Sequence, residues 1–427
     1  MTAASVTSPI TPPALRLLAG YQALGRPMGL RDHLAMYGAP PLPGTGSHRR
    51  MAREAIRLIE EAGLTGRGGG AFPTARKMRS VAMGRAGVVV VNAGEGEPLS
   101  GKDRLLLTVA PHLVLDGAAL AAHAVGARKI IVCVHGDSAT GIEAAVAERE
   151  PRADVPVQVS RLPGRYVASE ETALVSWLNG GQAKPAFTPP RPYERGVGGR
   201  PTLVSNAETY AHVALILRYG PGWFRACGTP DAPGTALFTV SGAVLGPGVI
   251  EAPLGTTVAD LLRMAGGPAE PLQAVLTGGY GGTWLPMSDA RTPTTPEALA
   301  AAGAALGPGI IVALPTRACG LAESARILHW LAGQTAGQCG PCVFGLPAIA
   351  RDLAAIAGCR AGPAVHGRLR GRLEVIAGRG ACRHPDGAVR FAVSALRVFG
   401  PHLNAHEGRE GCPAARQPSV LPARWGR

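Results

Sequence analysis

The chain has 427 residues, of which 46% are hydrophobic and 17% are charged, so it is long enough for about two to four globular domains. Its formal net charge is +14, but aromatic residues make up only 4% and no basic run is interleaved with them, which argues against nucleic-acid binding. The absence of a signal pattern and of any run of about 18 apolar residues predicts a cytoplasmic protein without a transmembrane segment.

The first part of the chain predicts an α/β domain behind an N-terminal arm. Residues 1–50 are rich in Pro and Gly and are expected to wrap over the core. Residues 51–230 alternate between helical and strand patterns. Helices are expected over 51–62, 113–126 and 138–149, and strands over 88–92, 129–134 and 155–162. Such alternation is typical of a domain with a mainly parallel sheet.

A glycine-rich loop follows the first of these helices. Backbone amides at Gly66 and Gly68 can approach a phosphate or a flat ring without a Cβ in the way, and Arg67 and Lys77 supply positive charge. The alternative is an ordinary turn. The loop therefore predicts a binding site for a phosphorylated ligand.

The strand over 88–92 ends in a second motif, with Glu95 and Glu97 just beyond it. Ligands sit past the carboxyl ends of parallel strands, so both carboxylates are expected near the same ligand. A solvated acidic turn is the alternative.

The second half of the chain changes character. Strands expected over 236–242, 248–253 and 274–279, with a helix over 258–265, predict a β-grasp module within 231–317. Residues 318–407 show helical periodicity over 322–332, 345–357, 368–377 and 387–399, which predicts a four-helix bundle, and 408–427 are expected to be a disordered tail. The cysteines cluster in this half, which favours a metal or cluster site over disulfides.

Six motifs occur in one order along residues 50–405 and resemble those of a known family. They read Gly66-Arg-Gly-Gly-Gly-Ala-Phe-Pro-Thr74, Val91-Asn-Ala-Gly-Glu-Gly-Glu-Pro98, Tyr166-Val-Ala-Ser-Glu-Glu-Thr-Ala-Leu174, Arg200-Pro-Thr-Leu-Val-Ser-Asn-Ala-Glu-Thr209, Phe238-Thr-Val-Ser-Gly242 and Gly337-Gln-Cys-Gly-Pro-Cys342. Together they resemble the flavoprotein subunit of NADH:quinone oxidoreductase (the NuoF family), which has relatives in NAD-linked hydrogenases and formate dehydrogenases. The resemblance implies an FMN-binding α/β domain, an SLBB-like β-grasp module and an iron–sulfur-binding helical domain.

The resemblance also implies a set of site residues. For FMN they are Gly66, Arg67, Gly68, Lys77, Asn92, Glu95, Ser169, Glu170, Glu171, Val204, Ser205, Asn206 and Thr209. For the nicotinamide nucleotide they are Phe72, Glu97 and Glu171, with Phe72 stacked on adenine. No acid–base residue is expected, because hydride transfer depends on stacking nicotinamide against flavin. For Glu170 and Glu171 the alternative is a helix N-terminus, which favours negative charge.

The cluster motif departs from the family pattern of Cys-x-x-Cys-x-x-Cys and a distant fourth cysteine. Ala336 stands at the first position and leaves Cys339, Cys342 and Cys382. A four-iron cluster prefers four thiolates. The three cysteines are therefore expected to hold a three-iron cluster, or a four-iron cluster with an outside ligand such as Cys319 or Cys359, with zinc or no metal as alternatives.

The flavin and nucleotide motifs depart too. Thr188 and Arg191 stand where the family has a lysine and a phenylalanine facing NADH, and Arg191 could instead bind a phosphate and favour NADPH. Gly94 and Gly96 replace an Asp and a Ser, and Ser169 replaces a glycine. Loss of a carboxylate next to the isoalloxazine is expected to raise the flavin potential.

The leading hypothesis is an FMN-dependent NAD(P)H dehydrogenase subunit that passes electrons through a C-terminal iron–sulfur cluster. Its partners would be NADH or NADPH and a ferredoxin-like or membrane redox subunit, in a hetero-oligomer that could lie at the inner membrane through that partner. The alternative is a non-catalytic binding or assembly paralogue that keeps the fold but has lost the cluster and the NADH site.

Overall fold

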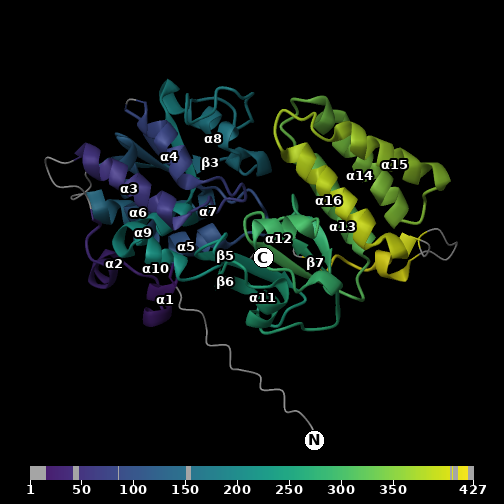
Figure 1. The fold of residues 1–427 in the computed structure, drawn as a ribbon. Coiled ribbons are helices and arrows are strands. Elements are labelled where there is room, and N and C mark those ends of the chain that lie inside the picture. The colour runs from purple at the N-terminus through teal and green to yellow at the C-terminus, as the bar shows by residue number, and fades with distance from the viewer. Residues whose placement is uncertain are drawn as a thin grey trace, which may run out of the picture.

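The computed structural model describes residues 16–41, 48–84, 86–150, 155–403, 406 and 412–421. Figure 1 shows an α/β part and a helical C-terminal part side by side, with a second, smaller β-rich part below and between them. This arrangement confirms the predicted fold class of an α/β domain, a β-grasp module and a C-terminal helical region.

The first sheet has four parallel strands in the order β3-β2-β1-β4. They are β1 (Val88–Ala93), β2 (Lys129–His135), β3 (Val157–Leu162) and β4 (Thr202–Asn206). Alternate side chains of β1 enter two separate apolar clusters, so both faces of the sheet are covered and the strand reads as one apolar run. The chain leaves β1 toward β3 and returns on the other side as β4, so the strand order reverses between β1 and β4.

Helices pack on both faces of this sheet. They are α3 (His48–Ala62), α4 (Thr74–Ala82), α5 (Lys102–Val109), α6 (Pro111–Val125), α7 (Gly136–Arg149), α8 (Glu171–Leu178), α9 (Ala207–Tyr219) and α10 (Pro221–Arg225). Helices α6 and α9 lie against one face and against each other, while α8 helps to cover the opposite face. A Cβ at Gly117 of α6 would lie 1.7 Å from the carbonyl oxygen of Tyr210, so this glycine permits the close contact of α6 with α9.

The second sheet has the order β6-β5-β9-β7-β8. Its elements are β5 (Thr235–Gly242), β6 (Gly248–Pro253), β7 (Leu272–Thr277), β8 (Thr283–Pro286) and β9 (Ile310–Pro315), with helices α11 (Val258–Met264) and α12 (Pro296–Ala301). Only the β5–β9 pair is parallel. One face packs on α11, and the other, which includes Leu276 and Trp284, packs on the C-terminal helices. Strands β8 and β9 are additions to the strands predicted from sequence.

The C-terminal part contains the four expected helices: α13 (Gly320–Gly333), α14 (Leu346–Ala357), α15 (Pro363–Ile376) and α16 (His384–Val398). Helix α13 packs on α14 and α16, and α14 packs on α15. Their apolar faces form one core with the second sheet, which seats the bundle against it.

Both terminal segments pack on the body where they are described. Residues 16–41 include α1 (Ala19–Leu24) and α2 (Leu30–Tyr37), and the Glu251 carboxylate of β6 accepts the amides of Arg16, Leu17 and Leu18 at 3.0 Å each. The rest of the predicted arm, 1–15 and 42–47, lies outside the described residues.

The expectation of a disordered tail is wrong for residues 412–421. The amide of Val420 donates to the Glu323 carboxylate at 3.0 Å, and Leu421 is buried. A buried acceptor and an apolar side chain thus fix a segment that composition alone suggested was loose. Residues 408–411 and 422–427 of that predicted tail lie outside the described residues.

Within the described part of the chain, no single helix is long and apolar enough to cross a membrane. The α5–α6 pair reaches that length and composition only jointly, across a bend of 96°.

Candidate functional site

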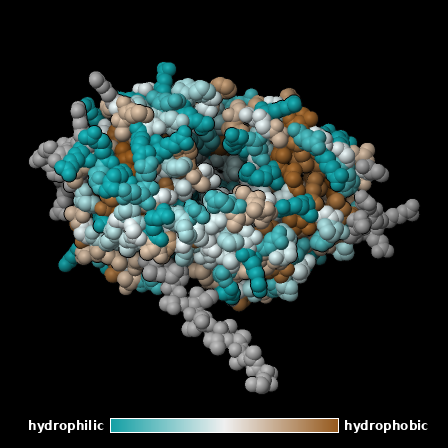
Figure 2. All heavy atoms as spheres, in the orientation of Figure 1, coloured by the Kyte–Doolittle hydropathy of each residue, from teal (hydrophilic) through white to brown (hydrophobic). Residues whose placement is uncertain are grey.

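A cavity of about 860 Å³ opens beyond the carboxyl ends of β1 and β4, where the strand order reverses. All three parts of the molecule line it. The second sheet contributes Gly278, Gly281, Gly307 and Pro308, and the helical part contributes residues from Cys382 to Arg390. Figure 2 shows the hollow between the α/β and helical parts.

The glycine loop and Lys77 form one wall. Gly66, Gly68 and Gly70 line the cavity, and the amide of Gly66 donates to the carbonyl of Phe72 at 2.9 Å, which closes the loop. The Lys77 ammonium donates to the Glu171 carboxylate and to the Val204 carbonyl, each at 3.0 Å. Lys77 thus supplies positive charge between the loop and the end of β4.

Arg67 and Thr209, both expected at the ligand, lie behind the loop. The guanidinium of Arg67 donates to the Thr65 hydroxyl and to the Pro233 carbonyl, and its amide donates to the Thr209 hydroxyl at 2.9 Å. Both side chains are buried outside the cavity lining, because the loop turns its backbone toward the cavity and the Arg67 side chain toward the protein. The structure therefore does not bring the Arg67 charge to the predicted phosphate site.

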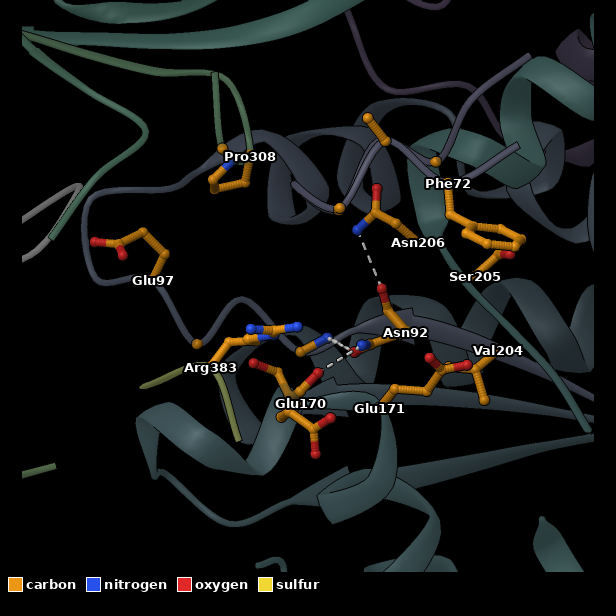
Figure 3. Close-up of a pocket in the computed structure, with 18 of the residues that line it drawn as sticks. Phe72, Asn92, Glu97, Glu170, Glu171, Val204, Ser205, Asn206, Pro308 and Arg383 are labelled. Atoms are coloured by element: carbon orange, nitrogen blue, oxygen red, sulfur yellow. Dashed lines mark hydrogen bonds between the residues drawn. The ribbon is translucent and has the colours of Figure 1, made fainter. Parts of the chain in front are cut away.

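Two asparagines meet at the point where the strand order reverses. Asn92 and Asn206 are paired in register at the ends of β1 and β4. The side-chain amide of Asn206 donates to the backbone carbonyl of Asn92 at 3.2 Å. The side-chain amide of Asn92 donates to the backbone carbonyl of Ser169 at 2.8 Å. Figure 3 shows both side chains facing the cavity, near Val204 and Ser205.

A buried charge cluster behind the asparagines was not predicted. The Lys102 ammonium donates to Asp103, Asn206 and Glu208 at 2.8–2.9 Å. Burial alone would lower the pKa of Lys102, but Asp103 and Glu208 outweigh it and raise that pKa, and Lys102 lowers the pKa of Glu208 to about 2 against the effect of burial. The cluster orients Asn206. A lysine next to an aspartate in a predicted acidic turn was the available signal.

Glu95 and Glu170 both cap helices at the cavity wall. Glu95 accepts the Ser100 hydroxyl and the amides of Asp103 and Arg104 at 2.8–3.1 Å, at the start of α5, and burial raises its pKa. Glu170 accepts the amides of Thr172 and Ala173 at 3.0 Å as the N-cap of α8. The helix-terminus interpretation thus accounts for Glu170, whose carboxylate also lines the cavity (Figure 3).

The other end of the cavity holds Glu97 and Tyr166, with Phe72 on the opposite wall. Glu97 accepts the Tyr280 amide at 2.9 Å and the Tyr166 hydroxyl at 3.3 Å, and burial raises the pKa of its carboxyl to about 7. Phe72 is 39% exposed and lines the cavity, as does Arg191. An exposed aromatic ring and a cation that line the same cavity can stack on and pair with a nucleotide.

The three predicted metal-ligating cysteines converge from two segments. Cys339 and Cys342 lie on the turn before α14, where the Cys342 amide donates to the Cys339 carbonyl at 3.1 Å, and Cys382 lies just before α16. Burial raises the pKa of Cys342 to about 12, and the neighbouring thiols of Cys339 and Cys382 contribute to that rise. Cys382 also lines the cavity, so this set of three cysteines lies next to the cavity.

The outside ligands considered from sequence, Cys319 and Cys359, lie at the other end of the bundle. Cys319 caps the start of α13, whereas Cys339 follows its end, and Cys359 follows the end of α14, whereas Cys342 precedes its start. Helices of 14 and 12 residues separate these positions by about 20 Å. Neither cysteine can complete the Cys339–Cys342–Cys382 group.

The residues present fit FMN and an iron–sulfur cluster. Glycines, a lysine and paired amide side chains at a strand switch point are the donor set that a phosphate and a polar ring edge require. Three thiols beside that cavity suit iron, with Ala336 at the first cysteine position of the family motif.

Comparison with known proteins gives consistent similarities. Family models match as the Nuo51 FMN-binding domain over residues 59–215, the SLBB domain over 237–283 and the NADH-ubiquinone oxidoreductase-F iron-sulfur binding region over 322–406. The chain is 32% identical to the second F subunit of the NADH-quinone oxidoreductase of Rhizobium meliloti, over 93% of this chain and 96% of the relative. It is 28% identical to the NADP-reducing hydrogenase subunit HndC of Solidesulfovibrio fructosivorans, over 91% and 82%.

A solved structure resembles most of the chain. The air-oxidized NAD+-reducing [NiFe]-hydrogenase contains a chain that superposes with a TM-score of 0.77 at 31% identity, over 93% of this chain and 69% of that one.

Proposed function

Because this chain belongs to the family of the F subunit of NADH-quinone oxidoreductase, we propose that its cavity holds FMN against a nicotinamide dinucleotide. The predicted resemblance is thereby confirmed. The chain is an NAD(P)H-oxidising electron-transfer subunit with an FMN-binding domain and an iron–sulfur-binding region, as the sequence predicted.

The observation that carries the site assignment is the position of the cavity. It lies at the switch point of a parallel sheet, between a glycine loop with Lys77 and the paired Asn92 and Asn206. We assign the phosphate to the loop and Lys77, and the polar edge of the ring system to the asparagines. Gly66, Gly68, Ser169, Val204 and Ser205 complete the contact surface. Glu95, Arg67 and Thr209 act by holding the walls in place.

We assign the nucleotide to the part of the cavity that runs from Phe72 across to Glu97, with Glu171 and Arg191 also in its lining. Phe72 offers a face for adenine, and the Arg191 guanidinium offers a charge for phosphate, which supports NADPH as a candidate beside NADH. The Glu171 carboxylate already accepts from Lys77, so it links the two halves of the site.

Electrons are proposed to leave the cavity on the side of Cys382. FMN held in the cavity would supply the chemistry that converts a hydride into single electrons, which an iron–sulfur cluster could carry. Cys339, Cys342 and Cys382 would hold that cluster, and the position of Cys382 in the cavity lining keeps the transfer distance short. We propose that the acceptor is a ferredoxin-like or membrane redox subunit in a hetero-oligomer, since relatives are named as subunits of larger complexes.

Two departures from the family pattern favour the alternative of a paralogue without activity. Ala336 leaves three thiols, and Thr188 removes a cation from the nucleotide loop. Such a chain would keep the cavity but would not transfer electrons.

Anaerobic purification with optical and EPR spectra tests the proposal. A flavin spectrum that is bleached by NADH or NADPH, with an EPR signal appearing on reduction, is the expected result. A colourless protein that takes up neither FMN nor iron on reconstitution would support the paralogue. Flavin that binds but is not reduced by either nucleotide would overturn the nucleotide assignment alone.

A further inference from the structure

A second group of metal-ligating side chains lies at the end of the bundle opposite the iron–sulfur position. It consists of Cys319, His406 and Cys412, whose ligand atoms all lie within 4.8 Å of one another. The Cys319 Sγ is 3.3 Å from the His406 Nε2. Cys319 and His406 are buried, and Cys412 is partly buried. The group lies about 20 Å from Cys339 and Cys342 along α13 and α14 and cannot share their cluster.

The hydrogen bonds of His406 prepare one ring nitrogen for a metal. Its Nδ1 lies 3.1 Å from the Ala357 carbonyl, which can only accept, so Nδ1 carries the proton in that bond. The neutral imidazole then presents an unprotonated Nε2 toward Cys319. A backbone carbonyl that fixes the tautomer in this way is the usual outer partner of a metal-bound histidine.

The two cysteines are held by their own neighbours. Cys319 is the N-cap of α13, and its sulfur accepts the Ala322 amide at 3.4 Å. The Cys412 amide donates to the sulfur of Cys359 at 3.3 Å, and that sulfur also lies 3.5 Å from the His406 Nδ1. Cys359 therefore sits behind the imidazole, as an outer partner that ties Cys412 to the end of α14.

We propose that Cys319, His406 and Cys412 bind a zinc ion. Two thiolates and one imidazole nitrogen match the ligand types that zinc prefers, and such a soft set disfavours calcium or magnesium. Binding removes the protons of both thiols and leaves one position of a tetrahedral site for water or a further donor.

The bound ion would fasten the C-terminal segment to the bundle. Cys412 opens a stretch in which the Ser419 hydroxyl and the Val420 amide donate to Glu323 of α13, and Leu421 is buried. Cys319 lies at the start of that same helix. Zinc at this point joins the start of α13, a residue beyond the end of α16 and the C-terminal segment, so its role is structural and separate from electron transfer.

Metal content of the anaerobically purified full-length chain tests the proposal. We expect about one zinc per chain in the wild type, and less than about a tenth of that in Cys319→Ser, His406→Ala and Cys412→Ser. The control is His402→Ala, which changes an exposed histidine near His406 and should keep zinc at the wild-type level. Cys382→Ser should lower iron and leave zinc unchanged.

A second measurement keeps the test independent of variants that fail to fold. Wild-type protein stripped of zinc by chelator and mercurial should take up cobalt(II) with thiolate-to-cobalt absorption, and zinc should then displace it. Zinc should also protect Cys319 and Cys412 from alkylation, as read by mass spectrometry. A disulfide between these cysteines in the native protein, or zinc that is unaffected by all three substitutions, would overturn the proposal. Flavin binding is unaffected by either outcome, so the result is independent of the proposed function.

Discussion

Lys77 and Arg67 have unequal roles at the cavity, because only Lys77 of these two belongs to its lining. Its ammonium meets Glu171 and the Val204 carbonyl inside the cavity lining, whereas the Arg67 guanidinium is bonded to Thr65 and Pro233 behind the loop. The two cations lie close in the sequence, but only one of them can reach a bound phosphate.

Removal of the Lys77 charge should therefore weaken FMN binding. We expect the dissociation constant of FMN from Lys77→Met apoprotein to rise about tenfold, which corresponds to about 1.4 kcal/mol for a charge-assisted contact. Fluorescence titration measures it. Lys129→Met, at the exposed start of β2, should match the wild type. Equal affinities for Lys77→Met and wild type would remove Lys77 from the site.

The carboxyl of Glu97 should make stability depend on pH. Burial raises its pKa from 4.5 to about 7, so between these values the folded state holds a proton that the unfolded state has lost. Stability contributed by this group is complete below about pH 4.5 and falls as pH rises through about 7.

We expect the melting temperature of Glu97→Gln to fall less than that of the wild type between about pH 5 and pH 7, because an amide does not titrate. Differential scanning fluorimetry measures both slopes. Glu297→Gln, an exposed glutamate of α12, should keep the wild-type slope. Parallel curves for Glu97→Gln and wild type would contradict the raised pKa.

At the scale of elements, helix contacts rather than helix propensity explain the α/β core. Helices α6 and α9 approach so closely that only glycine fits at position 117, where a Cβ would meet the Tyr210 carbonyl at 1.7 Å. Gly141 of α7, by contrast, faces open space. The two glycines therefore have opposite predicted responses to the same substitution.

Gly117→Ala should destabilise the protein by more than about 3 kcal/mol, because the backbones of two packed helices must separate. Gly141→Ala should be neutral or stabilise by up to about 1 kcal/mol, since alanine favours a helix. Thermal unfolding of both variants measures the difference. Similar melting temperatures for the two would rule out the close packing of α6 on α9.

The starts of two helices also form part of the cavity wall. Glu95 caps α5 and Glu170 caps α8, so each carboxylate both completes a helix and borders the ligand space. Substitution of either glutamate is therefore expected to weaken flavin binding and to lower the stability of the protein.

At the scale of the whole molecule, buried acidic residues connect parts that are far apart in the sequence. Glu208 of α9 accepts the Leu237 amide of β5 at 3.0 Å, and Glu251 of β6 accepts three amides of the N-terminal segment. These contacts hold the second sheet against the α/β part. We propose domain boundaries at 50/51, 230/231, 317/318 and 407/408.

Glu251→Ala should release the N-terminal segment. Three buried amides lose their acceptor, at a cost on the order of 3 kcal/mol, and cleavage near Arg16 by trypsin should become faster. Mass spectrometry of timed digests measures it. Glu270→Ala breaks only an ion pair with the exposed Arg317 and should leave both stability and cleavage unchanged. Unaltered digestion of Glu251→Ala would mean that other contacts hold the segment.

Much of the site could be predicted because motifs are local. The glycine loop, the end of β1 and the cysteine motif each carry their chemistry in a few adjacent residues. The short apolar runs typical of buried parallel strands also predicted the strand ends at which the cavity lies. The buried cluster of Lys102, Asp103 and Glu208 was not predicted, because a charged residue gives no sign in sequence of being buried beside its partners.

The sequence by itself determined the family, the order of the three parts and a share of the residues that line the cavity, because these depend on short-range patterns. Only the tertiary structure decided where side chains point. It turned Arg67 away from the ligand, placed Glu95 at the start of α5, and brought Cys319, His406 and Cys412 together. The physical reason is that side-chain direction and long-range proximity follow from packing between elements, which no local pattern records.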